Sequence, residues 1–594
     1  MMSSAEVPPR TSCFRSFEPT PNFLKFINCN DAPSGTVAQA LTQELEEVSS
    51  YLGDMEEQLH QSTSSSPLLT AERARISNIV SDYKVIFSPL RCFPNEILSE
   101  IFAASVGSHV EKFESDVATN SLDLHQGPWT LSRVSKKWRD VALSDSRLWR
   151  YVGFELDDTI PSHLLLELQL ERSGNYPLVV YIASTWRKDF LRGHPLLSII
   201  CSQSSRWRRA RLRFSEGTFA ETVLPIRSSL PALEYLMLEG FPDSLVRGPA
   251  ETDLFRNAPR LTSLTTNLTG RYLASFDLPW PQITRWLNVG NDIDPEFILR
   301  VLSEGQDSLR ILSLALGLFY PRTTPTPLRL SQLHTLWLTL YLPPSRQILD
   351  VLTVPGLRVL RLQGKASSQP SFILFDAVSQ FLERSGCTLE VLCLEIGPQP
   401  STAMLPHEAD YAAFFRMKEV ASLRKLIMDG WTSRSALEAL DANTVLHTSS
   451  GDQYLNDRDI SLPEEIDVLL PNLTELALYE GTYERTIVSE LKIIKNRLCI
   501  PRVQRLQTLR FSRDIRTVHR RGCVSASDGN SLSDTLDRGD AFNREELPEG
   551  AQENSVLSER ESTWSVQRLL ESLEDMGLKI VFDNEDNPDF GSVF

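Results

Sequence analysis

The sequence has no long apolar run, no leader-like N-terminus and no paired cysteines. Its longest apolar stretch, near residues 311–320 (ILSLALGLFY), is about half as long as a bilayer-spanning helix requires. The first residues, MMSSAEVPPRTS, show no basic region followed by an apolar run, which argues against a secretory signal. None of the eight cysteines lies in a Cys-x-x-Cys pair, so we expect buried thiols in a reducing compartment. These absences predict an intracellular protein, cytoplasmic and/or nuclear, with no membrane partner.

Basic charge and catalytic motifs are also scarce. The 60 Lys and Arg against 77 Asp and Glu give a net charge of −17, which argues against general binding to nucleic acid. We find no Gly-rich dinucleotide fingerprint, no Gly-x-Ser-x-Gly and no His-Glu-x-x-His. None of the nine histidines stands at ligand spacing beside a cysteine. We therefore expect no catalytic residues, no metal, no cofactor and no enzymatic activity, with a hydrolase or transferase of dispersed site as the alternative.

Length and composition predict several domains or one long repeat array. The 594 residues are 41% hydrophobic and 23% charged, as in soluble globular proteins. Residues 1–33 are rich in Pro, Ser and Asn, so we expect them to be poorly ordered.

Residues 34–87 carry the spacing of a helical hairpin. Seven apolar residues alternate in steps of three and four, as in a heptad seam: Ala38, Leu41, Leu45, Val48, Leu52, Met55 and Leu59. The polar segment 62–67 (STSSSP) then precedes a second helical stretch. We interpret this region as a hairpin or short coiled coil, and a dimer formed through residues 38–59 is the alternative.

From residue 175 onward the pattern Leu-x-x-Leu-x-Leu returns ten times. Its anchor positions are Leu233, Leu261, Ile283, Leu309, Leu333, Leu357, Leu389, Leu423, Leu473 and Leu506. Most intervals fall near the period of about 20–29 residues that is typical of leucine-rich repeats. In LRVLRL (357–362) alternate leucines enter a core from a short strand, and stacking of neighbouring units covers that core. The sequence predicts an α/β fold with an irregular leucine-rich-repeat solenoid over 175–521; ordinary βα units are the alternative.

The C-terminal part has a different composition. Residues 522–562 hold ten acidic and three basic residues and few apolar ones, so we expect a disordered acidic loop. The widest repeat interval, which contains residues 441–459, is interpreted as a surface excursion. In residues 563–594, Trp564 and the leucines that follow predict a helix, and LKIVF predicts a strand. We interpret this last segment as a terminal capping repeat and tail.

Two helical motifs lie between the hairpin and the repeats. FPNEILSEIF (93–102) places Ile97, Leu98, Ile101 and Phe102 at i, i+1, i+4 and i+5, which predicts one apolar helix face. LSRVSKKWRDVALSDSRLW (131–149) predicts a second amphipathic helix with the same kind of face. About 60 residues make a marginal domain alone, so this face must meet a neighbour. That neighbour is either another protein or the helical hairpin of the same chain.

The pair of motifs resembles the F-box of the F-box-like proteins of fungi, here over residues 88–152. The matching positions are Pro94, Glu96, Ile97, Leu98, Ile101, Phe102, Val134, Trp138, Arg139, Leu148 and Trp149. This sequence departs from the family pattern at Phe93, where Leu is usual, and at Ser135, where Cys is usual. The segment between the motifs, residues 103–130, is long for a minimal F-box. The hairpin before the motifs and the repeats after them also resemble the layout of that family.

The resemblance implies a substrate-receptor subunit of a cullin–RING ubiquitin ligase (SCF). In that family the F-box docks on a Skp-type adaptor, which joins it to the cullin, and the repeats hold a target protein. By this resemblance the adaptor-binding residues are Phe93, Pro94, Ile97, Leu98, Ile101, Phe102, Val134, Trp138, Leu148 and Trp149. An F-box protein that acts outside the ligase as a plain binding scaffold is the alternative.

Clusters of arginine are the candidates for target binding. RWRRARLRF (206–214) predicts a strand whose arginines face outward, and RDIRTVHRR (513–521) is a second basic cluster. Further arginines come from the repeat strands. Positive patches of this kind can receive an acidic or phosphorylated target segment, or they can be a solvated face balanced by nearby acids. The target-binding candidates are Arg209, Arg211, Arg310, Arg358 and Arg361.

Overall fold

The chain divides into two compact units in the computed structural model. The first unit contains residues 1–185 and 193–211, and the second contains 186–192 and 212–594. The structure describes residues 17–18, 20–61, 67–111, 120–156, 163–184, 194–215, 226, 230–241, 253–268, 270–290, 293–317, 319, 321–322, 326–340, 347–364, 372–396, 408–429, 435–440, 469–479, 487–498, 506–511 and 568–582.

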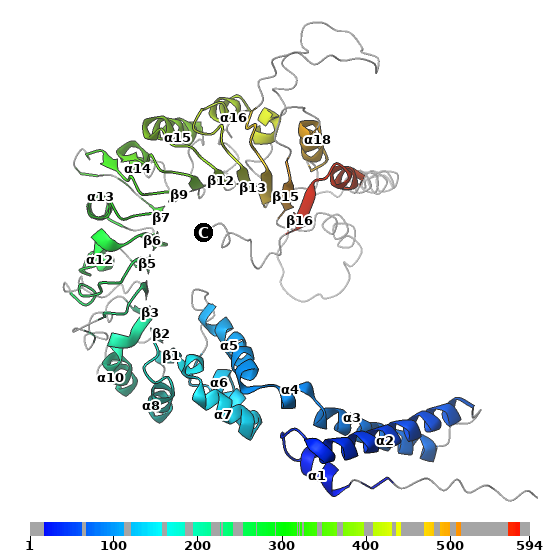
Figure 1. The fold of residues 1–594 in the computed structure, drawn as a ribbon. Helices are drawn as coiled ribbons and strands as arrows, with labels where there is room; N and C mark the ends of the chain where they lie inside the picture. The colour runs from blue at the N-terminus through cyan, green and yellow to red at the C-terminus, as the bar shows by residue number, and fades with distance from the viewer. Residues whose placement is uncertain are drawn as a thin grey trace, which may run out of the picture. The chain divides into compact units, whose positions relative to one another are not determined.

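The first unit begins with a helical hairpin, as the heptad spacing predicts. Helix α2 spans Gly35–Gln61 and helix α3 spans Pro67–Ile86 (Figure 1). Leu41, Val48 and Met55 of α2 are buried in a core that they share with α3. The heptad seam is therefore filled by the partner helix of the same chain. A dimer formed through residues 38–59 could therefore use only the α2 side chains that this packing leaves exposed.

A short helix lies inside the segment that the sequence predicts to be poorly ordered. Helix α1 spans Pro21–Ile27 and buries Phe23 and Phe26. The Thr20 side chain accepts a hydrogen bond from the Phe23 amide and so caps the helix, and the Phe23 ring lies 4.6 Å from that of Tyr83. The prediction for residues 1–33 is thus wrong over this helix, because two aromatic anchors outweigh the Pro and Asn around them. Residues 1–16 lie outside the described part.

Four helices and a short 3-10 turn follow the hairpin. Their bounds are Pro89–Cys92 (α4), Asn95–Glu111 (α5), Gly127–Val134 (α6), Lys136–Ser144 (α7) and Ser146–Trp149 (η2). The sequence predicts one helix across residues 131–141, whereas the structure has a break at Ser135. Ser135 is extended, and its hydroxyl accepts a hydrogen bond from the Trp138 amide at 3.1 Å. The residue that departs from the family pattern is the N-cap of α7.

Strands begin earlier than the leucine pattern predicts. After η2 the first unit contains β1 (Tyr151–Leu156), α8 (His163–Arg172), β2 (Leu178–Ser184), α10 (Pro195–Ser202), η3 (Ser204–Arg206) and β3 (Trp207–Ser215), the last of which extends into the second unit. β1 pairs in parallel with β2. The predicted start at residue 175 is therefore too late, because β1 lacks the Leu-x-x-Leu-x-Leu signature.

The second unit contains a long parallel sheet. Its strands are β4 (Tyr235–Phe241), β5 (Ser263–Asn267), β6 (Arg285–Asn288), β7 (Ile311–Leu316), β9 (Thr335–Leu340), β11 (Val359–Gly364), β12 (Val391–Ile396), β13 (Lys425–Asp429), β14 (Glu475–Tyr479), β15 (Thr508–Phe511) and β16 (Lys579–Phe582). They follow one another in that order, and all of these neighbours pair in parallel. The two short strands β8 (Leu328–Arg329) and β10 (Leu352–Thr353) pair separately.

The helices of the second unit cover one face of this sheet (Figure 1). They are α12 (Gly270–Leu273), η6 (Trp280–Gln282), α13 (Pro295–Glu304), α14 (Gln347–Val351), α15 (Phe372–Ser385), α16 (Glu408–Phe415) and α18 (Ile487–Leu498). All ten leucine-pattern anchors are buried, and each is followed two residues later by a strand. The α/β class and the strands that the pattern predicts are confirmed. Over the described residues, no helix covers the opposite face, which we call the open face.

The terminal segment adds the last strand. β16 pairs in parallel with β15, and Leu570 and Leu573 just before it are buried. Several predictions lie outside the described residues. They concern the surface excursion at 441–459, the basic cluster at 513–521, the acidic loop at 522–562, and Trp564.

Candidate docking surface on helix α5

Helix α5 carries two apolar stripes rather than one. Leu98, Phe102 and Val106, spaced by four residues, are 0%, 1% and 5% exposed. Ile97 and Ile101, also spaced by four, are 48% and 41% exposed. Residues i and i+1 are about 100° apart around a helix, so the predicted single face divides where α5 meets its neighbours. One stripe is the core of this helical module, and the other is left at its surface.

The buried stripe packs against tryptophans. The Phe102 ring lies 4.8 Å from the Trp138 ring of α7, and Trp129 of α6 meets Trp149 of η2 edge-on at 4.8 Å. The Trp149 indole donates a hydrogen bond to the Ala142 carbonyl at 2.8 Å, so its polar atom is satisfied inside the core. Burying a side chain of this size stabilises the fold by about 1.5–3 kcal/mol. This packing fixes the rotation of α5 about its axis.

The start of α5 is anchored by a lysine. Lys137 of α7 donates hydrogen bonds from Nζ to the Phe93 carbonyl at 2.6 Å and to the Arg91 carbonyl at 3.2 Å. The Leu98 amide donates to the Pro94 carbonyl at 3.1 Å, which begins the helical pattern. Arg91 in turn donates from Nη1 to the Phe26 carbonyl at 2.8 Å. The segment just before α5 is therefore connected to both α7 and α1.

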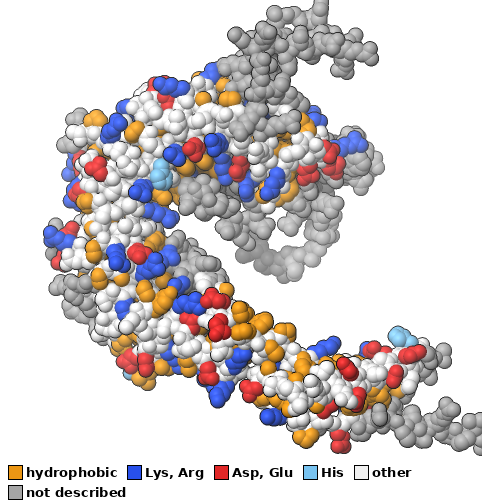
Figure 2. Space-filling view, in the orientation of Figure 1, with side chains coloured by type: hydrophobic (Ala, Val, Ile, Leu, Met, Phe, Trp, Pro, Cys, Tyr) orange, Lys and Arg blue, Asp and Glu red, His pale blue; other side chains and the backbone are white. Residues whose placement is uncertain are grey.

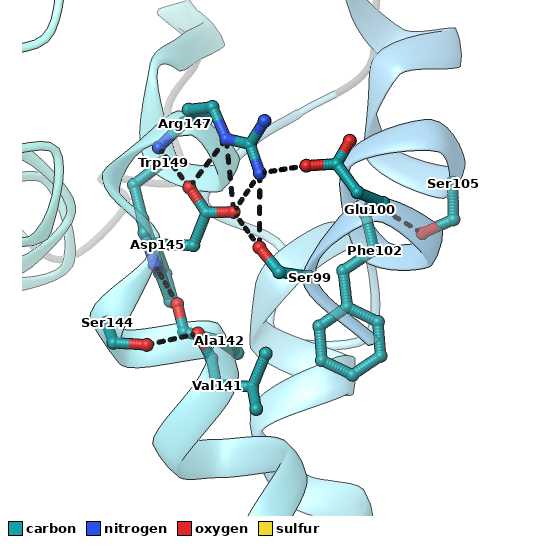
Figure 3. A network of polar contacts seen from close by, with 10 residues as sticks. All are labelled: Ser99, Glu100, Phe102, Ser105, Val141, Ala142, Ser144, Asp145, Arg147 and Trp149. Atoms are coloured by element: carbon teal, nitrogen blue, oxygen red, sulfur yellow. Dashed lines mark hydrogen bonds and ion pairs between the residues drawn. The ribbon is translucent and has the colours of Figure 1, made fainter. Parts of the chain in front are cut away.

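A polar cluster joins α5 to the α7–η2 corner (Figure 3). Asp145 accepts hydrogen bonds from the Ser99 hydroxyl, from the Arg147 amide at 3.0 Å and from the Arg147 guanidinium at 2.9–3.2 Å. The same guanidinium donates to Ser99 at 3.1 Å and to Glu100 at 2.9 Å. We call Ser99, Glu100, Asp145 and Arg147 the polar lock. It holds the exposed stripe of α5 in one orientation relative to α7.

The polar lock favours an ionised Asp145. Burial alone raises the pKa of this carboxyl, but the hydrogen bonds from Arg147 and Ser99 outweigh burial and lower the pKa below its ordinary value. The same contacts with Asp145 and Glu100 raise the pKa of Arg147. The lock is therefore a charged cluster at neutral pH, and acid should weaken it.

The structure divides the predicted adaptor-binding residues into three groups. Pro94, Ile97, Ile101 and Val134 are exposed. Phe93 and Trp138 are partly buried, while Leu98, Phe102, Leu148 and Trp149 are buried. The four buried residues are core of this chain, so a foreign surface cannot reach them in this conformation. They support the site without forming its surface.

Two further exposed apolar side chains belong to the same helices. Leu90 in α4 is 46% exposed and Leu143 in α7 is 39% exposed. Val134 at the end of α6, which belongs to the predicted set, is 45% exposed. Sequence reasoning passed over Leu90 and Leu143 because neither continues a helical stripe. The polar lock was also missed, although Asp145-Ser-Arg147 has the short spacing typical of an aspartate that caps a turn.

The arginines predicted to bind a target lie in different surroundings. Arg310 and Arg358 are exposed, and Arg209 is partly buried. Arg211 is on the outward face of β3 as predicted, but it is only 1% exposed and lies 5.4 Å from the Tyr181 ring. The strand alternation is thus confirmed, whereas the accessibility expected of Arg211 is wrong, because the neighbouring strand covers it. Arg361 stacks on Trp337 at 5.0 Å and forms an ion pair with Glu395 at 2.7 Å.

A scan against protein-family models gave no match, and neither did a search of curated protein sequences. In the described ranges, no helix is both long and apolar enough to span a bilayer. No group of three His, Cys, Asp or Glu among those residues is placed to hold a metal ion. Cys201 and Cys387 are buried thiols, and burial raises their pKa to about 12 and about 11, which disfavours the reactive thiolate.

Proposed function

We propose that this chain is the substrate-receptor subunit of a cullin–RING ubiquitin ligase and not itself an enzyme. The helices of residues 88–152 dock on a Skp-type adaptor that leads to the cullin. The open face of the parallel sheet holds a target protein. The observation that carries the proposal is the exposed pair Ile97 and Ile101, at 48% and 41% exposure, beside the buried stripe of Leu98, Phe102 and Val106 on the same helix.

The adaptor surface that we propose is smaller than the motif. Its apolar anchors are Pro94, Ile97 and Ile101 of the first motif and Val134 at the end of α6. Exposed apolar side chains on a rigid base are typical of the few central residues that dominate an interface. Phe93 and Trp138 contribute their accessible edges. The motif residues in the core matter because they hold these anchors in place.

We propose that strands β4–β16 form a leucine-rich-repeat solenoid. Three features support this: the order of the strands follows the sequence, the anchors are buried at every repeat, and the helices lie on one face only. Each strand–helix unit then buries its leucines only against the next unit. Such an array leaves a continuous strand face for binding a target.

The mechanism that follows is proximity. One chain carries two binding surfaces, so a target held on the sheet stays close to the ligase that is held by the helices. Ubiquitin transfer then becomes effectively intramolecular, and its rate depends on effective concentration rather than on catalytic residues of this chain. The proposed receptor therefore needs no catalytic group of its own.

The test is co-purification with both ligase subunits. The full-length chain is co-expressed with a Skp-type adaptor and a cullin, and the tagged chain is isolated. We expect all three to elute together, and we expect the variant Ile97→Lys/Ile101→Lys to lose both partners. The matched control is Leu68→Lys/Leu164→Lys, which places the same charges at two other exposed leucines, 73% and 61% accessible.

The outcomes separate the proposal from its alternative. Adaptor without cullin would favour an F-box scaffold that acts outside the ligase, and loss of neither partner in the isoleucine variant would contradict the docking surface. Equal losses in the leucine control would show that charge alone disrupts the complex. Light scattering on the wild-type chain tests the dimer alternative, and a monomer would exclude it.

A further inference from the structure

Four neighbouring strands of the sheet carry a local excess of basic charge. Strands β6, β7, β9 and β11, each taken with the residue just before it, hold Arg285, Arg310, His334, Arg358 and Arg361. The same segments, 284–288, 310–316, 334–340 and 358–364, contain no Asp or Glu. Four neighbouring strands therefore contribute only basic or neutral side chains. This local excess of positive charge contrasts with the net charge of −17 of the whole chain.

Backbone hydrogen bonds align three of these residues in one row. The His334 amide donates to the Arg310 carbonyl and the Arg358 amide donates to the His334 carbonyl, both at 3.0 Å. The Arg310 amide donates to the Thr284 carbonyl at 2.8 Å, so Thr284 continues the row, whereas Arg285 pairs with Ile311 one position further along the strands. Neighbouring positions in the row are thus one strand spacing, about 4.8 Å, apart. We call Arg310, His334 and Arg358 the basic row.

The basic row lacks strong counter-charges within the described part of the chain. No hydrogen bond or ion pair is made there by the Arg310 side chain. Arg358 reaches Glu390 only at 3.8 Å, with both side chains largely exposed, and such a pair contributes little. Burial together with Arg358 and Arg310 lowers the pKa of His334, as a positive surrounding should.

Neighbouring positive charges without counter-ions repel one another, and a bound anion would remove this cost. Arg361 is a different case, since it stacks on Trp337 and pairs with Glu395. It lies three residues further along β11 than Arg358, in register with Trp337, and is not part of the basic row. Figure 2 shows basic side chains gathered beside a histidine in the region of β7 and β9.

We propose that the basic row binds an extended acidic segment of a protein, through carboxylate or phosphate oxygens. The row runs across the strands, so an extended peptide that follows it would meet the guanidinium groups of Arg310 and Arg358 on either side of His334, and such groups bind carboxylates and phosphates in bidentate geometry. This proposal gives the chemical class of the target protein. It rests on the proposed function, in which the sheet holds that target. Of the five arginines predicted to bind a target, it keeps Arg310 and Arg358.

The test measures binding of labelled peptides to the full-length chain by fluorescence anisotropy. The probes are a deca-glutamate peptide, a serine-rich peptide with and without phosphates, and a DNA oligonucleotide of matched charge. We expect the glutamate or the phosphorylated peptide to bind, and the unmodified peptide not to bind. Which of the two binds more tightly identifies the source of the anionic groups. Tighter binding of the DNA would contradict the proposal.

The decisive variant is Arg310→Glu/Arg358→Glu. Its control is Arg256→Glu/Arg300→Glu, which changes net charge equally at two exposed arginines of the same unit. We expect the first variant to weaken peptide binding at least about tenfold, the scale of losing one well-placed ion pair, and the control to weaken it far less. Equal losses in both would mean non-specific attraction and would overturn the proposal. No adaptor is present in this experiment, so its failure is distinct from failure of the docking surface on α5.

Discussion

Each unit has a surface whose side chains are not paired within the unit, and the two surfaces differ in chemistry. On the helices of the first unit, isoleucines 97 and 101 and Val134 are apolar and exposed. In the basic row of the second unit, Arg310 lacks a counter-charge among the described residues. An apolar surface gains most from a dry, shape-complementary partner, and a basic row gains most from an anionic one. This difference is consistent with the two chemically different partners that the proposed receptor function requires.

Strands β13–β15 show what a matched surface looks like in the same sheet. Glu475 lies 2.9 Å from both Lys425 and Arg510, which come from the strands on either side. Here acidic and basic side chains alternate across the strands and neutralise one another. The same sheet can therefore balance its charges, and the basic row is a local departure from that balance.

Substitution on the two stripes of α5 should separate core from surface most clearly. We expect Leu98→Ala to lower the free energy of unfolding by about 2–5 kcal/mol, because it leaves a cavity between α5 and the tryptophans. Ile101→Ala should change it by less than about 1 kcal/mol, because the side chain is already 41% exposed. Urea unfolding of both variants measures this. Equal losses would mean that the two stripes are not distinct.

The polar lock should give a smaller, pH-dependent effect. Asp145→Asn removes a charged cap and should cost about 1 kcal/mol at neutral pH. The folded-state pKa of Asp145 lies below its ordinary value of 3.8, so its stabilisation is present above that value and is lost as pH falls through the lowered pKa. The stability difference between wild type and variant should therefore shrink only in acid. A difference that persists unchanged to the lowest accessible pH would contradict the ionised lock.

The sheet charges should give the smallest effect on stability, and its sign is informative. Lys425→Ala removes half of a matched pair and should lower stability by no more than about 1 kcal/mol. Arg310→Ala removes a charge that faces only like charges, so stability should stay the same or rise slightly. Thermal unfolding at low and high salt compares them. If Arg310→Ala destabilises as much as Lys425→Ala, the guanidinium of Arg310 has a counter-charge in the chain.

The sheet was largely predictable because strand alternation is a local signal. Each Leu-x-x-Leu-x-Leu copy places its leucines in the core, and the ten anchors are buried without exception. The early strand β1 and helix α1 lack that signal. α1 is held by Phe23 and Phe26 against helices far along the chain, and sequence spacing alone cannot identify such contacts.

The docking surface was predictable as a motif but not residue by residue. Ile97 and Leu98 are adjacent, both aliphatic, and equally suited to a wide apolar face. Which of them is buried depends on how Trp138 and Trp149 fill the space beside α5, and that is a property of packing. The break at Ser135 and the polar lock likewise depend on side-chain hydrogen bonds that periodicity does not reveal.

The most direct test of the account is the affinity of the purified full-length chain for a purified Skp-type adaptor, measured by calorimetry. We predict that Ile97→Ala/Ile101→Ala weakens this affinity at least about 100-fold while the free energy of unfolding stays close to that of wild type. The matched variant Leu68→Ala/Leu164→Ala should bind as wild type does. An unchanged affinity in the isoleucine variant, or no adaptor binding by the wild-type chain at all, would contradict the central claim.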